Sequence, residues 1–214
     1  MTSTEKDSAE FDFGAFVAKH QKNLVRAGGA VVVVGLGAWF VMASSSRKAQ
    51  NAEQAYVSAE RSYYSGNAQL AESDLAKVID RYGNTAAGIR ASILLAKHYY
   101  EASKPAEGVA ALKTALGRGA AKPFRPALNS LIAGGFEAEG KLDSAGVAYE
   151  AAASEAISQT EKEQYQGYAG RAYMAAGKKA EALRIWQGLA ARETSPLANE
   201  AKLRIGELSA VAAR

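Results

Sequence analysis

The longest uncharged stretch of the chain lies near its N-terminus. Residues 27–46 read AGGAVVVVGLGAWFVMASSS, with Arg26 before them and Arg47 and Lys48 after them. A helix rises about 1.5 Å per residue, so this stretch would span about 30 Å, the thickness of the hydrocarbon core of a bilayer. The pattern therefore predicts a transmembrane helix over residues 26–46. A buried core helix is the alternative, but no amphipathic stripe nearby would pack against it.

A short segment precedes the predicted span. Residues 1–10 are polar, whereas the apolar side chains from Phe11 onward follow a helical period with lysines on its flanks. Residues 1–25 are therefore expected to form an N-terminal tail with an interfacial amphipathic helix. Two alternatives are a plain extension of the span and a cleavable signal peptide. The four acidic residues of this leader are atypical of a signal peptide.

The rest of the chain, residues 49–214, shows an internal repeat of 37 residues. Each copy carries a small residue seven positions before a turn and another five positions after it. A large apolar residue follows nine positions after the turn. The turn positions are Gly66, Ser103, Gly140 and Gly177. Small residues let two antiparallel helices approach closely, so the pattern predicts stacked helix hairpins.

Four helix pairs follow from this register. They are expected over residues 49–65 and 68–82, 86–102 and 105–117, 123–139 and 142–156, and 160–176 and 178–192. Pro105 and Pro123 would occupy first helical turns, where a missing N–H is tolerated. A ninth helix, over residues 196–212, is expected to cap the stack. Three of its residues would close the open end: Leu203, Ile205 and Leu208.

Composition narrows the classes of function. The formal net charge of +4 gives no basic footprint for nucleic acid, and the chain has no cysteine. Its two histidines, His20 and His98, stand far apart, and no phosphate loop, serine elbow or metal-ligand spacing occurs. We therefore expect no enzyme activity, no cofactor, no metal and no small-molecule substrate.

The repeat offsets resemble the tetratricopeptide repeat, a helix–turn–helix unit of about 34 residues. The predicted fold class is thus all-α: one N-terminal transmembrane helix, then a tetratricopeptide-like α-solenoid of four pairs and a capping helix. In that family the first helix of each pair lines a concave groove, which implies a partner-binding surface there. The matching positions are Tyr56, Glu60, Tyr63, Tyr64, Arg90, Lys97, Tyr100, Gln164 and Arg171. Tyrosine and arginine suit such a surface, although the tyrosines could instead pack between neighbouring pairs.

The whole layout also resembles the ancillary subunit of the bacterial Sec translocon. The resemblance rests on the tail segment FDFGAFVAKHQKNLVR, the single N-terminal span and the repeat domain. It implies an anchor in the bacterial inner membrane, a cytoplasmic N-terminus, a periplasmic repeat domain and protein partners in a membrane complex. The charges favour this orientation weakly, because three basic residues precede the span and two follow it closely.

Two functional hypotheses stay open. The first is a membrane-anchored scaffold or chaperone-like accessory subunit of the Sec type, which binds polypeptide through the groove. The second is a structural subunit of another large inner-membrane assembly, such as a respiratory, photosynthetic or envelope-biogenesis complex, held through its transmembrane helix. Gly28, Gly35 and Ala38 share a face of that helix and would let a neighbouring helix approach closely.

Overall fold

A computed structural model describes the backbone of residues 13–210, and the side chains from residue 42 to residue 210 together with those of Leu36, Trp39 and Phe40. All regular structure within this part of the chain is helical. The elements are α1 (Phe13–Tyr64), α2 (Ala68–Tyr82), α3 (Ala86–Glu101), α4 (Pro105–Leu116), η1 (Gly119–Phe124), α5 (Arg125–Ala138), α6 (Leu142–Glu155), α7 (Gln159–Ala175), α8 (Lys179–Ala190) and α9 (Ala198–Ala210). The helix η1 is a short 3₁₀-helix, and the others are α-helices.

The chain divides after Lys48 into two units, and each is described by itself. The predicted span, residues 26–46, falls within α1, but most of its side chains lie outside the described residues, as do residues 1–12 of the predicted tail. Among the residues that are described, no helix is both long enough and apolar enough to cross a membrane.

Helix α1 differs from the sequence prediction in where it begins. A separate helix was expected to start near residue 49, whereas α1 runs without a break from Phe13 to Tyr64. The reason is local, because residues 38–64 contain no glycine or proline that would end a helix. The first helix of the first pair is therefore the C-terminal part of α1.

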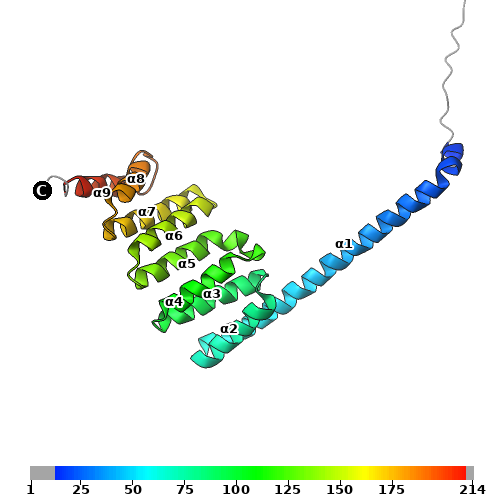
Figure 1. The fold of residues 1–214 in the computed structure, drawn as a ribbon, viewed down its shortest axis with the longest axis horizontal. Coiled ribbons are helices and arrows are strands. Elements are labelled where there is room, and N and C mark those ends of the chain that lie inside the picture. The colour runs from blue at the N-terminus through cyan, green and yellow to red at the C-terminus, as the bar shows by residue number, and fades with distance from the viewer. Residues whose placement is uncertain (1–12, 211–214) are drawn as a thin grey trace, which may run out of the picture. The chain divides into compact units, whose positions relative to one another are not determined.

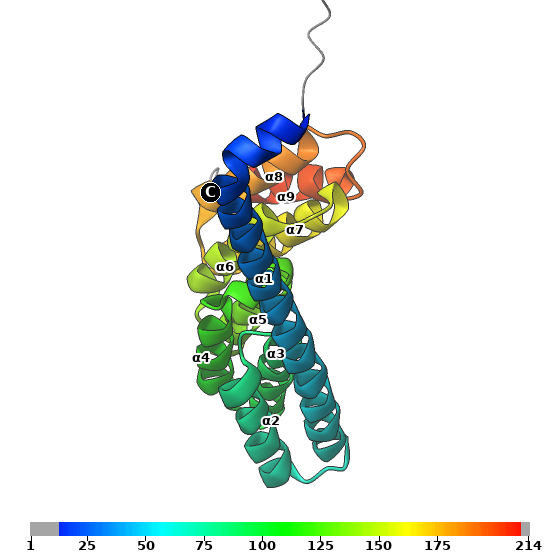
Figure 2. The same ribbon diagram turned by 90° about the vertical axis from the view of Figure 1, so that its right-hand side faces the viewer.

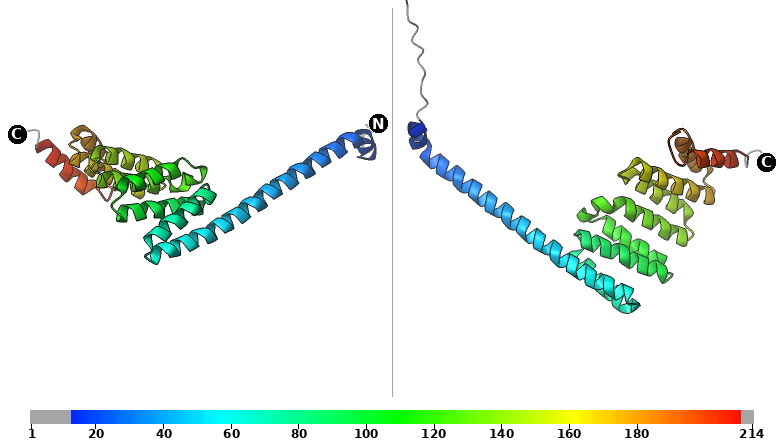
Figure 3. Two further views of the ribbon diagram at one scale, coloured as in Figure 1. Left: turned by 60° about the horizontal axis from the view of Figure 1, so that its bottom comes forward. Right: turned by 180° about the vertical axis from the view of Figure 1, so that it is seen from behind.

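From α2 onward, the helices stack in chain order (Figure 1). A view turned by 90° shows α4 and α6 on one side of the stack and α3 and α5 on the other (Figure 2). The same succession is visible from two further directions (Figure 3). The predicted helix pairs with a period of 37 residues are thus confirmed, and their ends fall close to the predicted positions.

The turns between the two helices of each pair share one backbone conformation. All four predicted turn residues have positive φ: Gly66 at 79°, Ser103 at 58°, Gly140 at 72° and Gly177 at 72°. Glycine adopts this left-handed region without the steric penalty of a Cβ atom, and it commonly closes helices in this way. The repeat in the sequence therefore corresponds to a repeat in backbone geometry.

The core follows the predicted spacing of small and large residues. Ala59, Ala96 and Ala133, which lie one repeat apart, are at most 1% exposed. At the fourth equivalent position, a Cβ atom on Gly170 would lie 2.6 Å from Cε2 of Trp186. The large residues beside these crossings are also buried: Leu75, Leu112, Tyr149 and Trp186. The small residues therefore permit the two helices of each pair to approach closely.

Two details of the predicted helices are wrong. Pro123 lies inside η1, and Pro126 instead occupies the first turn of α5. Helix α9 begins at Ala198, and Leu203 is 60% exposed rather than closing the stack. The packed face of α9 has helical spacing and consists of Ala198, Ala201, Ile205 and Leu208. Leu203 falls off that face, because a helix turns about 100° per residue.

Candidate partner-binding groove

The nine residues predicted to line the groove come from three helices. Four lie on α1, three on α3 and two on α7. The structure brings Tyr56 against Arg90 and Tyr63 against Lys97, and Tyr63 also bonds to Glu101 of α3. Tyr100, the third predicted residue of α3, packs instead against α4 and α5. The α7 residues instead contact other side chains of α7, α8 and α9.

Tyr56 lies at the interface between α1 and α3. Its ring is 8% exposed, and its hydroxyl donates a hydrogen bond of 2.8 Å to Oε1 of Glu60. The guanidinium carbon of Arg90 lies 4.5 Å from the ring centroid, and Arg90 also pairs with Glu53. Burial, followed by the bond to Glu60, raises the pKa of Tyr56 to about 12. Tyr56 is therefore protonated at neutral pH, and its contact with Arg90 joins α1 to α3.

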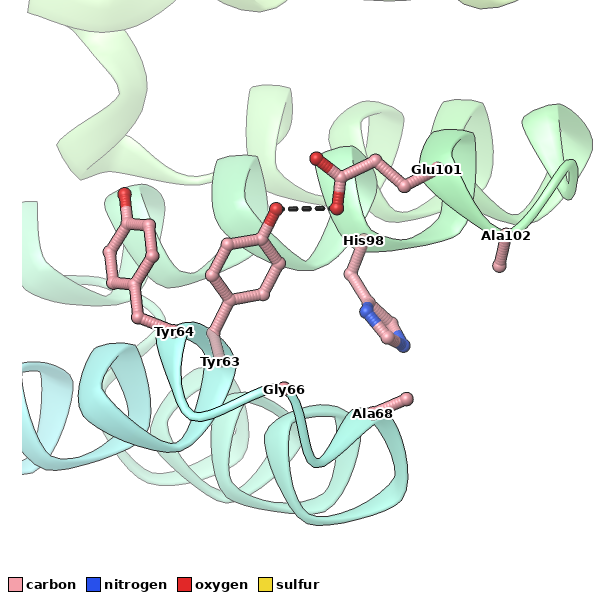
Figure 4. A pocket seen from close by; sticks show the side chains of 7 residues that line it. All are labelled: Tyr63, Tyr64, Gly66, Ala68, His98, Glu101 and Ala102. Carbon is pink, nitrogen blue, oxygen red and sulfur yellow. Dashed lines mark hydrogen bonds between the residues drawn. The ribbon is translucent and has the colours of Figure 1, made fainter.

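A pocket of about 420 Å³ opens at the C-terminal ends of α1 and α3 (Figure 4). We call it the α1–α3 pocket; it is lined by Tyr63, Tyr64, Gly66, Ala68, His98, Glu101 and Ala102. The Tyr63 hydroxyl donates to Oε2 of Glu101 at 2.5 Å, the dashed line in Figure 4. The Tyr63 and Tyr64 rings meet edge to face, with centroids 5.1 Å apart. The Tyr64 ring is 70% exposed.

The electrostatics of the α1–α3 pocket fix Tyr63 in place. Burial and the hydrogen bond to Glu101 raise the pKa of Tyr63 to about 12, so its hydroxyl stays a donor at neutral pH. Lys97 lies 5.8 Å from the Tyr63 ring centroid and 3.9 Å from Oε1 of Glu101. The Tyr63 hydroxyl is therefore paired with Glu101, whereas the Tyr64 ring is presented to solvent at the same pocket.

The sequence prediction did not include Glu101 and His98 in the groove. Glu101 stands 37 residues after Tyr64, and therefore occupies the same repeat position on the next helix pair. His98 contacts the Tyr63 ring edge to face, with centroids 6.2 Å apart. The repeat register alone could have identified Glu101, whereas the approach of His98 depends on how the two helices cross.

Tyr100 lies between helix pairs. Its hydroxyl donates to the carbonyl oxygen of Leu131 at 2.9 Å. A Cβ atom on Gly108 would lie 2.3 Å from the Tyr100 ring, which shows how closely α4 approaches it. Burial raises the pKa of Tyr100 to about 12. The structure therefore gives Tyr100 a packing role among α3, α4 and α5.

A second pocket, of about 280 Å³, lies between α7 and the segment before α9. Arg171 lines it and donates two hydrogen bonds to Glu200, at 3.0 Å and 2.6 Å. This pairing lowers the pKa of Glu200. Gln164 donates to the hydroxyl of Tyr168 at 3.0 Å. Both predicted residues on α7 thus line a pocket, with the Arg171 guanidinium already occupied by a carboxylate.

The predicted helix-contact face of the span consists of Gly28, Gly35 and Ala38. These residues lie in α1, but their surroundings are not among the features that the structure describes. Among the side chains that the structure describes, no group of three His, Cys, Asp or Glu residues could hold a metal ion.

Comparison with known proteins agrees with the fold. A family model described as a tetratricopeptide repeat-like domain matches residues 17–204. The nearly identical TPR-like repeats of a putative kinesin light chain from Podosopora anserina are similar, with a TM-score of 0.53 and 19% identity over 72% of this chain and 83% of that chain. A substituted variant of those repeats has the same TM-score and coverage at 20% identity. At such identities the likeness shows the fold alone. No curated protein matches the chain.

Proposed function

Because the chain belongs to the tetratricopeptide repeat-like domain family, we propose that it is a membrane-anchored protein-binding scaffold, an accessory subunit of an inner-membrane complex of the Sec translocon type. Arrays of this family are scaffolds for protein–protein interaction and are not enzyme folds. The proposal adds an anchor, a location and a kind of complex to that general role.

The α1–α3 pocket is the observation that carries the proposal. Tyr64 exposes most of its ring while Tyr63 supports it from one side. A large ring that is already oriented loses little conformational freedom on binding, and tyrosine is common at the centres of interfaces. The Glu101 carboxylate and the His98 ring supply polar groups around it. This combination suits a polypeptide partner better than a small apolar ligand.

Membrane anchoring rests on the N-terminal part of the chain. The uncharged residues 27–46 support it, together with four large apolar side chains of α1 that are described and exposed. Their exposed fractions are 61% for Leu36, 67% for Trp39, 68% for Phe40 and 71% for Met42. Such a surface favours contact with lipid or with another apolar surface. Following the Sec resemblance, we propose that the N-terminus is cytoplasmic and the repeat domain periplasmic.

The same exposed apolar side chains also favour a second candidate function. A structural subunit of another large inner-membrane assembly would make its main contact through α1, with the repeats secondary. Gly28, Gly35 and Ala38 would then face a neighbouring helix. The two candidates differ in which surface retains the partners, and this difference can be measured.

Partner recovery after gentle detergent extraction distinguishes the two candidates. Full-length chain is expressed at native level as wild type, as Tyr64→Ala with His98→Ala, and as Gly35→Leu. Loss of an exposed aromatic anchor at the centre of an interface should reduce partner recovery roughly tenfold. Leu70→Ala on α2, which also removes an exposed apolar side chain, serves as the control. Circular dichroism checks that helix content is unchanged in each variant.

The scaffold proposal expects loss with the Tyr64 and His98 double variant and full recovery with Gly35→Leu. Loss with Gly35→Leu alone would instead support the fixed structural subunit, because a leucine blocks close approach of a neighbouring helix. Equal recovery from every variant would contradict both candidates.

A further inference from the structure

The links between successive helix pairs differ in charge along the array. They fall in equivalent windows of ten residues, 79–88, 116–125, 153–162 and 190–199. The first two windows together contain four basic residues and one acidic residue, a net charge of +3. The last two together contain two basic residues and three acidic residues, a net charge of −1. Positive charge is therefore concentrated at the first two links.

Direct contacts join the first link to the second. Nη1 of Arg118 donates to the carbonyl oxygen of Ile79 at 3.2 Å, and the backbone N–H of Ala120 donates to Oδ1 of Asn84 at 3.0 Å. Gly83 permits this approach, because a Cβ atom there would lie 1.5 Å from Nη1 of Arg118. The helix η1 is thus fixed against the end of α2, and the basic residues of both links share one edge of the repeat unit.

We call Arg81, Arg118 and Lys122 the basic edge. Arg81 and Lys122 are exposed, and Arg118 is partly exposed. None of the three forms an ion pair with the side chains that the structure describes. Arg125, the fourth basic residue of these links, is instead paired at 2.8 Å with a carboxylate of α6. Asp80 is the one acidic residue in the two windows, so the basic edge keeps an excess of positive charge.

The basic edge lies at the end of the repeat unit where the chain enters it. The unit begins at Ala49, in α1. Arg81 and Ala55 line the same small cavity between α1 and α2, and Glu53 pairs with Arg90 early in α3. The first two links therefore lie beside the first turns of the unit, whereas the turns within each pair lie at the other ends of the helices.

Only two residues separate this unit from the uncharged stretch of the proposed membrane anchor. Ser46 ends the stretch, and Arg47 and Lys48 precede Ala49. Two residues of a helix advance by only about 3 Å. If the stretch spans the bilayer as proposed, the end of the unit that carries the basic edge is tethered close to the headgroups. Lysine and arginine are attracted to anionic lipid within a Debye length of the surface, about 10 Å at 0.1 M salt.

We propose that the basic edge binds anionic phospholipid headgroups beside the anchor, an inference that rests on the proposed membrane anchor. Arg81 and Lys122 would pair with headgroup phosphates, while Arg118 adds positive charge and holds η1 in place. A lipid surface matches this edge because it presents many phosphates at the place where the chain leaves the bilayer. Nucleic acid is disfavoured, since the rest of the chain adds little positive charge. The contact goes beyond the proposed function, which gives only the span to the membrane.

Resonance energy transfer in lipid nanodiscs tests the contact. Full-length chain carries a donor dye on Gly117→Cys, an exposed position next to Arg118, and a trace lipid carries the acceptor on its headgroup. The chain contains no other cysteine, so the label is unique. Transfer should be higher in discs of phosphatidylcholine with phosphatidylglycerol than in phosphatidylcholine alone. About 1 M salt should remove this difference, because the Debye length falls to about 3 Å. A donor on Ser65→Cys, in the turn between α1 and α2, should show no such difference.

Two double variants with the same loss of charge test the assignment to this edge. Arg81→Gln with Lys122→Gln should reduce the equilibrium constant for the lipid contact roughly 30-fold. Arg61→Gln with Lys104→Gln removes two exposed cations at the opposite ends of the helices and should leave transfer unchanged. Arg118 is kept in both, because its hydrogen bond to the end of α2 supports the fold. Circular dichroism checks that helix content is unchanged.

The proposal is overturned if transfer from Gly117→Cys is the same in both lipid compositions, or if both double variants change it equally. Equal lipid responses of Gly117→Cys and Ser65→Cys would overturn it too. Competition by soluble glycerol 3-phosphate would assign the edge to a free phosphate ester rather than to a lipid surface. Tight binding of a DNA duplex through Arg81 and Lys122, with no response to phosphatidylglycerol, would make the edge a nucleic-acid surface instead.

Failure of this inference is distinguishable from failure of the proposed function. The Tyr64 and His98 double variant should keep the lipid response, because it leaves α2 and η1 intact. Elution of the chain apart from the nanodiscs would contradict the membrane anchor itself. Sedimentation with phosphatidylglycerol vesicles would then test the edge alone, and equal sedimentation of wild type and the Arg81 and Lys122 double variant would overturn it.

Discussion

Ser103 and Gly140, which lie one repeat apart, end their helices in the same left-handed conformation, with φ of 58° and 72°. In each turn the next residue, a lysine, donates its backbone N–H at 2.8 Å to a carbonyl oxygen five residues back, that of Tyr99 or Phe136. The backbone therefore sets the turn, and the serine side chain is not needed for it. At this positive φ the Cβ atom of Ser103 causes steric strain that a glycine avoids.

We expect Ser103→Gly to stabilise the chain by about 1 kcal/mol, because it removes the Cβ atom from a left-handed position. For a chain of this size that gain should raise the midpoint of thermal unfolding by about 2–4 °C. Circular dichroism of the full chain would record it. Gly140→Ser, the reciprocal change at the equivalent turn, should lower the midpoint by a similar amount. A gain from both substitutions would refute the equivalence of the two turns.

Gly134 and Gly135 are neighbours on α5 with opposite surroundings. A Cβ atom on Gly134 would contact nothing within 4 Å, whereas one on Gly135 would lie 2.4 Å from Cγ2 of Val109 and 2.5 Å from the Tyr100 hydroxyl. Gly134→Ala should therefore stabilise the chain by about 0.5–1 kcal/mol, since alanine favours a helix interior. Gly135→Ala should destabilise it by about 1–3 kcal/mol through overpacking. Chemical denaturation of both variants checks the pair, and destabilisation by Gly134→Ala would contradict the packing described for α5.

The sequence predicted the repeat domain well because its main signals are local. The small residues and the turn residues recur every 37 residues, and each acts within one helix pair. Counting along the sequence was therefore enough to place Ala59, Ala96 and Ala133 in the core. The four turn residues likewise needed no knowledge of the tertiary structure.

The candidate sites were less predictable, since they depend on contacts between helices. Tyr63 and Tyr100 occupy the same repeat position, yet one bonds to Glu101 and the other to the backbone of Leu131. The pairing of Arg171 with Glu200 depends on where α9 packs, and α9 itself was predicted to begin two residues too early.

Glu163 on α7 should give the chain a measurable dependence of stability on pH. Its side chain is 5% exposed, and hydrogen bonds from Gln159 and Ser195 lower its pKa, with a smaller effect of Arg192. The charged form is thus favoured by folding. The resulting stabilisation is complete above the unfolded pKa of about 4.3 and is lost as the pH falls through the lower folded pKa.

We expect Glu163→Gln to destabilise the chain at pH 7 and to reduce the loss of stability below about pH 5. Unfolding midpoints of wild type and variant, measured from pH 7 down to pH 3, should therefore converge at the acid end. Glu193→Gln, an exposed neighbour, is the control and should follow wild type throughout. Parallel curves for wild type and Glu163→Gln would show that the Glu163 carboxylate does not stabilise the fold.

Labelling of single cysteines tests the proposed orientation across the membrane. The chain contains no cysteine, so Ser3→Cys and Ser209→Cys each introduce one thiol, the second on an exposed position of α9. A membrane-impermeant maleimide is applied to intact spheroplasts, and labelling is compared with that after permeabilisation. Both thiols should react once the membrane is opened, which controls for their accessibility.

In intact spheroplasts we expect Ser209→Cys to react and Ser3→Cys to be protected. This expectation follows from the proposed span over residues 26–46 and from the three basic residues close to its start, which favour a cytoplasmic N-terminus. The reverse labelling would contradict the proposal that the repeat domain is periplasmic, and with it the proposed Sec-type accessory role. Reaction of both thiols in intact cells would place both ends outside the cytoplasm. Protection of both thiols would place the whole chain on the cytoplasmic side. That result would agree with a scaffold role but would contradict the proposed span.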